Sequence, residues 1–166
     1  MKNIILIGMP ASGKSTAGVI LAKILGMDFL DTDLLIQQRE GMLLREIIEQ
    51  RGVDAFLKCE EEALLSVHTE NTVIATGGSA VYSQPAMDEF RRTGTICYLK
   101  VEKDELFRRL RDVKERGVVL RSGEDLEEMY EHRSRLYEKY ADIVIPEKGS
   151  TIEGTVQLIV ESIENG

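Results

Sequence analysis

A glycine-rich segment that ends in a lysine and two hydroxyl residues is the stretch of this sequence best suited to chemistry. Gly8 to Ser15 fits the pattern G-x-x-x-x-G-K-[ST], in which glycines let backbone N–H groups turn toward a phosphate. A helix that begins after Gly13 would aim its unpaired amides and the positive end of its dipole at that phosphate. Lys14 would reach the β- and γ-phosphates of a nucleotide, and the Ser15 hydroxyl would hold Mg²⁺.

The alternative for this segment is a chance loop of glycine and serine before a helix. An apolar strand pattern precedes it and a helical pattern follows it, and this context favours the nucleotide-binding loop. We expect the nucleotide contacts to come from Gly8, Ala11, Ser12, Gly13, Lys14, Ser15 and Thr16.

Two more predicted strands end in residues that could do chemistry. Asp31 and Asp33 follow one strand, and a phosphoryl transferase needs one carboxylate near Mg²⁺ and often another to orient or deprotonate the attacking hydroxyl. The alternative is that one of these aspartates only caps the helix that follows. Gly77 and Gly78 follow another strand, where they would allow close approach of a ligand or simply make a tight turn.

Basic side chains in the second half of the chain offer positive charge to a phosphate or a carboxylate. The loop predicted from Asp112 to Gly123 carries Arg116 and Arg121, and it fits either a lid that closes over phosphates or a solvated surface loop. Arg133 lies on the next predicted helix, where most arginines pair with neighbouring glutamates. In a cleft, its forked guanidinium would bind a substrate carboxylate through two hydrogen bonds.

The elements that must position these residues alternate between strands and helices. Strands are predicted over 3–8, 71–76, 95–101 and 142–145, with a short segment over 27–30 that leads to the aspartates. Helices are predicted over 14–25, 34–50 with a break at Gly41, 53–68, 85–92, 103–111, 124–140 and 152–164. This alternation predicts one α/β domain over 1–166 with a parallel sheet, whose ligands bind beyond the carboxyl ends of the strands.

Composition limits the class of protein. The 166 residues are 43% hydrophobic and 30% charged, as in one ordinary globular domain, and the net charge of −8 argues against a nucleic-acid partner. Cys59 and Cys97 show no metal-binding spacing, so we expect incidental thiols in a reducing cytosol. We find no signal peptide and no apolar stretch of transmembrane length, and we predict a cytoplasmic protein without a membrane partner.

Taken together, the motifs resemble those of the shikimate kinase family. The likeness spans nearly the whole chain, through GMPASGKST, LDTD, GVDAFLKCEEEAL, ATGGSAV, the arginine-bearing loop and RSRLYEKYAD. It implies a three-layer αβα fold like that of the nucleoside monophosphate kinases, with a five-stranded parallel sheet. It further implies a substrate-binding helical region near 33–62, a lid near 112–123, a monomer, and phosphorylation of shikimate by ATP and Mg²⁺ in aromatic amino acid biosynthesis.

The resemblance implies roles on the nucleotide side of the site. Lys14 and Ser15 would serve ATP and Mg²⁺, and Asp31 would support the metal through water. Arg109 would lie near the adenine, and Arg116 would be the lid arginine that faces the transferred phosphate.

On the acceptor side, the resemblance implies that Asp33 holds and activates the substrate hydroxyl. Glu60, Gly77 and Gly78 would lie against the substrate, a small hydroxy acid. Arg133 would bind its carboxylate.

Three positions depart from the family pattern. Leu57 stands where the family has an arginine that also binds the carboxylate, and Lys58 lies about 100° further around the helix. Ser79 replaces a third glycine, and Gly117 replaces a proline of the lid. A lost charge-assisted hydrogen bond is worth about 1.5–3 kcal/mol, enough to change the acceptor.

Two alternatives to a shikimate kinase therefore stay open at this point. One is a kinase of another small alcohol, such as homoserine or gluconate. The other is a nucleotide-dependent switch without transferase activity, although a protein that only binds nucleotide has no need of Asp31, Asp33 and a lid arginine together.

Overall fold

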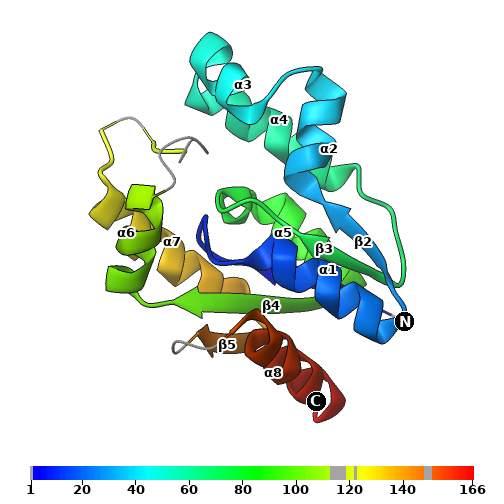
Figure 1. Ribbon diagram of the computed structural model, residues 1–166. Coiled ribbons are helices and arrows are strands. Elements are labelled where there is room, and N and C mark those ends of the chain that lie inside the picture. Colours follow the sequence, from blue (N-terminus) through cyan, green and yellow to red (C-terminus); the bar gives the residue numbers. More distant parts are fainter. Residues whose placement is uncertain (1, 113–118, 122, 148–150) are drawn as a thin grey trace.

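Five parallel strands form the centre of the computed structural model, which describes residues 2–112, 119–121, 123–147 and 151–166 (Figure 1). The strand order is β2-β3-β1-β4-β5, and every neighbouring pair is parallel. The strands are β1 (Asn3–Ile7), β2 (Asp28–Asp31), β3 (Thr72–Ala75), β4 (Gly94–Val101) and β5 (Ile143–Glu147). Since β2, β3 and β1 are adjacent, the loops after these three strands meet at one edge of the sheet.

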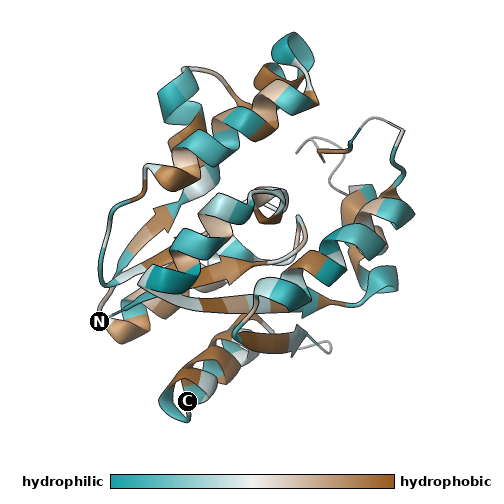
Figure 2. Ribbon diagram, turned by 180° about the vertical axis from the view of Figure 1, so that it is seen from behind, coloured by the Kyte–Doolittle hydropathy of each residue, from teal (hydrophilic) through white to brown (hydrophobic). Residues whose placement is uncertain are grey.

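Helices cover both faces of this sheet and extend beyond its β2 end. They are α1 (Lys14–Leu25), α2 (Thr32–Glu40), α3 (Leu44–Arg51), α4 (Val53–Leu65), the 3₁₀ helix η1 (Ala80–Tyr82), α5 (Gln84–Thr93), α6 (Lys103–Asp112), α7 (Leu126–Tyr140) and α8 (Ile152–Glu164). Figure 2 shows hydrophobic strands at the centre, between helices that mix hydrophobic and hydrophilic segments. None of the helices in the described part of the chain combines the length and the apolar character that crossing a bilayer requires.

The hydrophobic side chains form a cluster on each face of the sheet. Ile5 and Ile7 of β1 point into one cluster with α4, α5 and α7, whereas Ile4 and Leu6 point into the other with α1 and α8. A strand buried on both faces reads as a continuous apolar run, which is why β1 shows no alternation in the sequence.

A third hydrophobic cluster lies apart from these two. It joins α2, α3 and α4 to the described residues 119–121 of the predicted lid, through Ile36, Ile47, Phe56, Ala63 and Val119. The helical region expected to bind the substrate therefore has apolar packing of its own.

The predicted α/β class and five-stranded parallel sheet are confirmed, with corrections to several boundaries. The segment predicted at 27–30 is a true strand. The break predicted at Gly41 is confirmed, since the helical stretch predicted over 34–50 forms the two helices α2 and α3. The helix predicted over 53–68 ends at Leu65, and the strand predicted over 71–76 covers only residues 72–75. The helix predicted from residue 124 begins at Leu126, because the Asp125 carboxylate accepts a hydrogen bond from the Glu128 N–H (2.8 Å) and caps it.

Two further differences concern short elements. The 3₁₀ helix η1 was not predicted, since three residues are too few to show a period. The helix α6 includes Asp112, so the predicted lid is shorter at its start, and residues 113–118 and 122 of that lid lie outside the described residues.

Candidate active site

The loop between β1 and α1 has the strained backbone that a phosphate-binding loop needs. Gly8 has a φ of 150°, and a methyl group there would lie 2.7 Å from the Leu99 carbonyl oxygen, so only glycine fits. Ala11 has a φ of 63° and Gly13 a φ of 84°. These conformations turn the loop back over the N-terminus of α1, where unpaired amides attract an anion.

Lys14 lies inside this loop and is almost fully buried. Its ammonium group donates hydrogen bonds to the carbonyl oxygens of Gly8 (2.8 Å) and Met9 (2.7 Å) and to the hydroxyl of Ser12 (3.2 Å). Burial lowers the pKa of Lys14 to about 8, while the Asp33 carboxylate opposes that shift. The cation is thus held by the loop at the point where nucleotide phosphates are expected.

The two carboxylate oxygens of Asp31 make different contacts. One carboxylate oxygen accepts hydrogen bonds from the N–H groups of Asp33 (2.9 Å) and Leu34 (3.3 Å), which caps α2. The other accepts a hydrogen bond from the Ser15 hydroxyl at 2.7 Å. Helix capping and proximity to the predicted metal ligand are therefore compatible in one side chain.

The oxygen pair of Ser15 and Asp31 fits Mg²⁺, which binds one or two protein oxygens and completes its shell with water and phosphate oxygens. Within the residues described, no three His, Cys, Asp or Glu side chains gather as a cage for a metal ion. A magnesium ion here would accordingly depend on nucleotide phosphates for part of its coordination.

Asp33 faces the same cavity as Lys14. The cavity has a volume of about 180 Å³, and its walls include Lys14, Ser15, Asp33, Gly78 and Arg133. Burial raises the pKa of Asp33 to about 6, and the neighbouring Asp31 carboxylate raises it further while Lys14 lowers it. At neutral pH this carboxylate is ionised and more basic than an ordinary aspartate.

Arg133 forms the opposite wall of that cavity and is 1% exposed. Its guanidinium donates a hydrogen bond to the Tyr82 hydroxyl at 3.1 Å and another to the Val119 carbonyl. A methyl group at Gly78 would lie 2.9 Å from an Arg133 nitrogen and 2.6 Å from Pro10. The glycine therefore lets the loop after β3 fit between the nucleotide loop and this arginine.

Glu60 and Gly77 lie beside Asp33. Burial raises the pKa of Glu60 to about 7; a hydrogen bond from Ser79 opposes the shift, the Asp33 carboxylate adds to it, and the Arg133 charge opposes it. A methyl group at Gly77 would lie 2.6 Å from an Asp33 oxygen and 3.1 Å from a Glu60 oxygen. Two carboxylates thus approach the end of β3 because no side chain stands between them.

Arg109 and Leu57 occupy the margins of the site. Arg109 donates a hydrogen bond to the Ala11 carbonyl (3.1 Å) and pairs with Glu147, so it joins α6 and β5 to the nucleotide loop. Leu57 lines a separate groove with Arg121 and makes no wall of the Asp33 cavity. Arg116 lies outside the described residues, so its predicted role stays a prediction.

Ser79 and Tyr82 were not predicted as site residues, and Arg121 was predicted only as a basic residue of the lid loop. Tyr82 binds Arg133, the Arg121 guanidinium carbon lies 4.4 Å from the centre of the Tyr82 ring, and Ser79 binds Glu60. No local pattern distinguishes them, because each acts on a residue from another helix.

Comparison with known proteins places this geometry in a family. The model of the family described as shikimate kinase matches residues 10–164. A curated shikimate kinase from Paracidovorax citrulli (strain AAC00-1) is 38% identical over 166 residues, which covers 96% of this chain and 90% of the relative. The chain belongs to the shikimate kinase family. Another shikimate kinase, from Clostridium botulinum (strain 657 / Type Ba4), is 41% identical over 148 residues, 87% of either chain.

Solved structures of shikimate kinases share the whole fold. The enzyme from Acinetobacter baumannii, in complex with shikimate, gives a TM-score of 0.91 at 27% identity and covers 99% of this chain and 94% of that one. The enzyme from Aquifex aeolicus gives a TM-score of 0.85 at 34% identity, with coverage of 98% and 96%. The family resemblance and the P-loop kinase fold are confirmed.

Membership of the shikimate kinase family settles the class of activity. The chain is an ATP-dependent small-molecule kinase that uses Mg²⁺, and not a nucleotide-binding switch without transferase activity. The roles of individual residues rest on the geometry described above and remain predictions.

Proposed function

We propose that this protein transfers the γ-phosphate of ATP to a hydroxyl of shikimate, giving shikimate 3-phosphate and ADP. The observation that carries the proposal is that Lys14, Asp33 and Arg133 line one cavity. A cation for phosphate, a base for a hydroxyl and a cation for a carboxylate are the three groups that this transfer requires.

On the nucleotide side, the amides of the Gly8–Ser15 loop and the ammonium of Lys14 bind the phosphates. Ser15 would hold Mg²⁺ and Asp31 would support it through water, and when bound the ion would supply positive charge next to the phosphates. Arg109 lies beside the adenine, and Arg116 faces the transferred phosphate, as the family resemblance implies.

On the acceptor side, Asp33 orients the reacting hydroxyl and accepts its proton as the oxygen attacks the γ-phosphorus. Its raised pKa, about 6, suits this role because the group is ionised at neutral pH and still a better base than an ordinary aspartate. Arg133 binds the acceptor carboxylate, and Glu60, Gly77 and Gly78 lie against the rest of the molecule.

The protein works as a monomer in the cytoplasm, without a nucleic-acid or membrane partner. In support, the family resemblance implies a monomer, and the net charge of −8 disfavours a phosphate backbone as partner. Light scattering after size-exclusion chromatography measures the oligomeric state directly.

An assay of ADP formation tests the proposal with shikimate, homoserine and gluconate side by side. We expect turnover with shikimate and a product with phosphate at the 3-position, established by ³¹P and ¹H NMR. A Lys14→Met variant controls for ATPase contamination. Turnover of homoserine or gluconate without turnover of shikimate would overturn the acceptor and keep the reaction class, and Leu57 would then be the first position to examine.

A further inference from the structure

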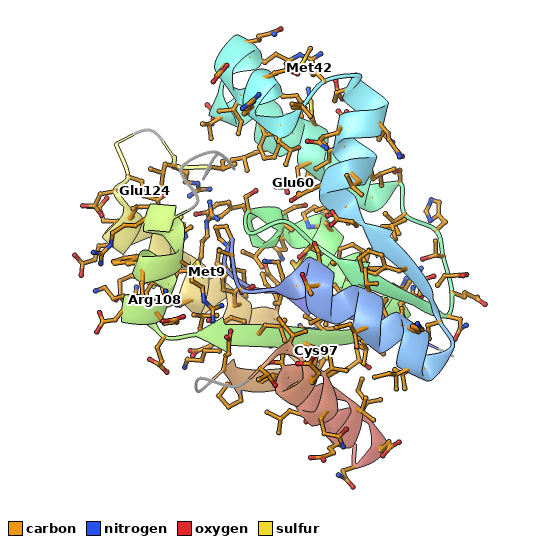
Figure 3. The ribbon with its side chains drawn as sticks, in the orientation of Figure 1. Met9, Met42, Glu60, Cys97, Arg108 and Glu124 are labelled. Carbon is orange, nitrogen blue, oxygen red and sulfur yellow. The ribbon has the colours of Figure 1, made fainter. Side chains whose placement is uncertain are left out.

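A buried hydrogen bond joins two polar side chains at the acceptor end of the site, Glu60, already placed against the acceptor, and Ser79, which has no role so far. Glu60 of α4 is 2% exposed, and Ser79, just before η1, is 5% exposed. The Ser79 hydroxyl donates a hydrogen bond of 2.6 Å to Glu60 Oε1. In Figure 3, Glu60 extends from α4 toward the loop that follows β3.

In the described part of the chain, the second carboxylate oxygen of Glu60, Oε2, has no such hydrogen bond. Among the described residues, Glu60 Oε2 has no hydrogen-bond partner although it is shielded from solvent. It lies 3.1 Å from the position that a methyl group on Gly77 would take, and an Asp33 oxygen lies 2.6 Å from the same position. Gly77 lines the cavity that holds Asp33, and because Gly77 has no side chain, Oε2 lies close to this part of the cavity wall.

An unpaired buried carboxylate oxygen costs free energy until it receives a donor. The acceptor of the proposed function is rich in hydroxyl donors, and Asp33 uses only the one that reacts. A neighbouring hydroxyl of the same molecule is therefore a suitable partner for Glu60 Oε2.

We propose that Ser79 is a positioning residue for the phosphate acceptor. By occupying Oε1 of Glu60 it fixes the carboxylate so that Oε2 accepts a hydrogen bond from an acceptor hydroxyl next to the one that Asp33 activates. The inference rests on the proposed function, and it assigns a role to a residue that stands where the family pattern has glycine.

The pKa of Glu60 offers a way to detect the loss of its hydrogen bond from Ser79. Asp33 from α2 and Arg133 from α7 act on its charge, and the groove that Glu60 lines also holds the titratable or charged side chains of Lys58, Glu61, Tyr82 and Arg121. The hydrogen bond from Ser79 favours the ionised carboxylate, so its removal raises the pKa of Glu60.

Four proteins test the inference: the unaltered chain, Ser79→Ala, Glu60→Gln and the double variant. For Ser79→Ala we expect KM for shikimate to rise about tenfold, the loss of a hydrogen bond to a charged group, while KM for ATP stays unchanged. In Ser79→Ala, the acid limb of the pH profile of kcat/KM for shikimate should move to higher pH, because kcat/KM reports the pKa values of groups in the free enzyme. In the Glu60→Gln background, Ser79→Ala should not move the acid limb, and the limb that Asp33 gives near pH 6 should remain.

The double variant decides whether Ser79 acts through Glu60. We expect Ser79→Ala to have no further effect on KM in the Glu60→Gln background. An equal effect in both backgrounds, or a rise in KM for ATP as large as that for shikimate, overturns the inference. Ser79→Thr keeps the hydroxyl and should restore KM, and melting temperatures identify any variant that does not fold.

Failure of the proposed function gives a different result. If the unaltered chain does not phosphorylate shikimate, the function is wrong, and the same four proteins are then compared with whichever alcohol it does phosphorylate. In that case an unchanged acceptor KM in Ser79→Ala overturns the inference about Ser79 by itself.

Discussion

Asp31 and Asp33 stand one residue apart, yet their surroundings give them different chemistry. Asp31 is partly exposed, and hydrogen bonds from Ser15 and from the start of α2 occupy its two oxygens. Asp33 is turned into the cavity, where burial and the neighbouring carboxylate raise its pKa. The environments separate a carboxylate suited to supporting a metal from one suited to accepting a proton.

Replacement of Asp33 tests this division. Asp33→Asn keeps the size of the side chain and removes the base, so we expect turnover to fall at least about a hundredfold while the Kd for ATP changes little. In the unaltered enzyme, activity should fall as the pH drops through about 6, because Asp33 becomes protonated there. Calorimetry gives the Kd and a coupled assay gives turnover; near-normal turnover in the variant would show that Asp33 is structural only.

The lowered pKa of Lys14 predicts that ATP binding also depends on pH. Its pKa is lowered to about 8 by burial in the nucleotide loop, and the negative charge of ATP phosphates raises the pKa of an adjacent ammonium. Above pH 8 the free enzyme has lost that proton in part, so ATP binding takes up a proton and weakens as the pH rises. Titration calorimetry at pH 8.5 in two buffers of different ionisation enthalpy measures the uptake.

A Lys14→Met variant is the control for that measurement. It should bind ATP more weakly, and with no buffer-dependent enthalpy from this position. Equal binding enthalpies in both buffers for the unaltered protein would contradict the prediction.

At the scale of elements, the contact between Ser15 and Asp31 joins the N-terminus of α1 to that of α2. Both helices begin at the carboxyl edge of the sheet, after β1 and β2, and the hydrogen bond of 2.7 Å connects their first turns. Asp31 therefore combines a helix cap with the position proposed to support the metal, and different substitutions can remove these two properties separately.

Two variants of Asp31 make that separation. Asn caps a helix about as well as Asp, so Asp31→Asn should leave the free energy of unfolding nearly unchanged, whereas Asp31→Ala should lower it by about 1 kcal/mol. Both lose the carboxylate and should need more Mg²⁺ for half-maximal activity. Denaturant unfolding and Mg²⁺ titrations check the two effects, and an unchanged Mg²⁺ requirement in both variants would leave Asp31 as a cap only.

Several of the helices and strands could be located from the sequence alone. Periodicity and end signals located β1, α1, α5 and α8 within about two residues, because each carries a long apolar pattern or a glycine or proline at its end. The nucleotide loop was equally readable, since all its parts are consecutive. The four residues of β2 were recognised only as a lead-in to Asp31, because a short, partly exposed edge strand has little pattern.

Contacts between distant elements could not be predicted in this way. The hydrogen bond from Ser79 to Glu60 spans 19 residues, and that from Arg133 to Tyr82 spans 51. Each depends on how α4, η1 and α7 pack against the sheet, which no local pattern encodes. The family resemblance supplied Glu60 and Arg133 as candidates, but it gave no partner for either.

At the scale of the whole molecule, the acceptor side has a hydrophobic cluster distinct from the two beneath the sheet faces. Val119, in the described part of the predicted lid, belongs to that cluster, and its carbonyl accepts a hydrogen bond from Arg133. An acceptor bound at Arg133, as proposed, would therefore adjoin a unit built from α2, α3, part of α4 and residues 119–121. This packing supports the proposal that residues 33–62 act as the substrate-binding region.

Hydrogen–deuterium exchange tests whether this region responds as a unit. We expect shikimate with ADP to slow exchange in α2, α3 and residues 119–121, while the amides of β1, β3 and β4 stay as they were. An Arg133→Met variant, which lacks the carboxylate contact, should lose most of that protection at the same ligand concentrations. Equal slowing across the sheet and the acceptor helices would contradict a separate response.

The parallel sheet has one further consequence, for practical work with the protein. Since every strand runs in the same direction, the turn between α4 and β3, residues 66–71, lies at the edge opposite the reacting groups. A fluorophore, an affinity handle or a surface linkage placed in that turn is separated from the chemistry by the full length of the strands. The enzyme can thus be tethered or tagged there while its working end remains open to nucleotide and acceptor.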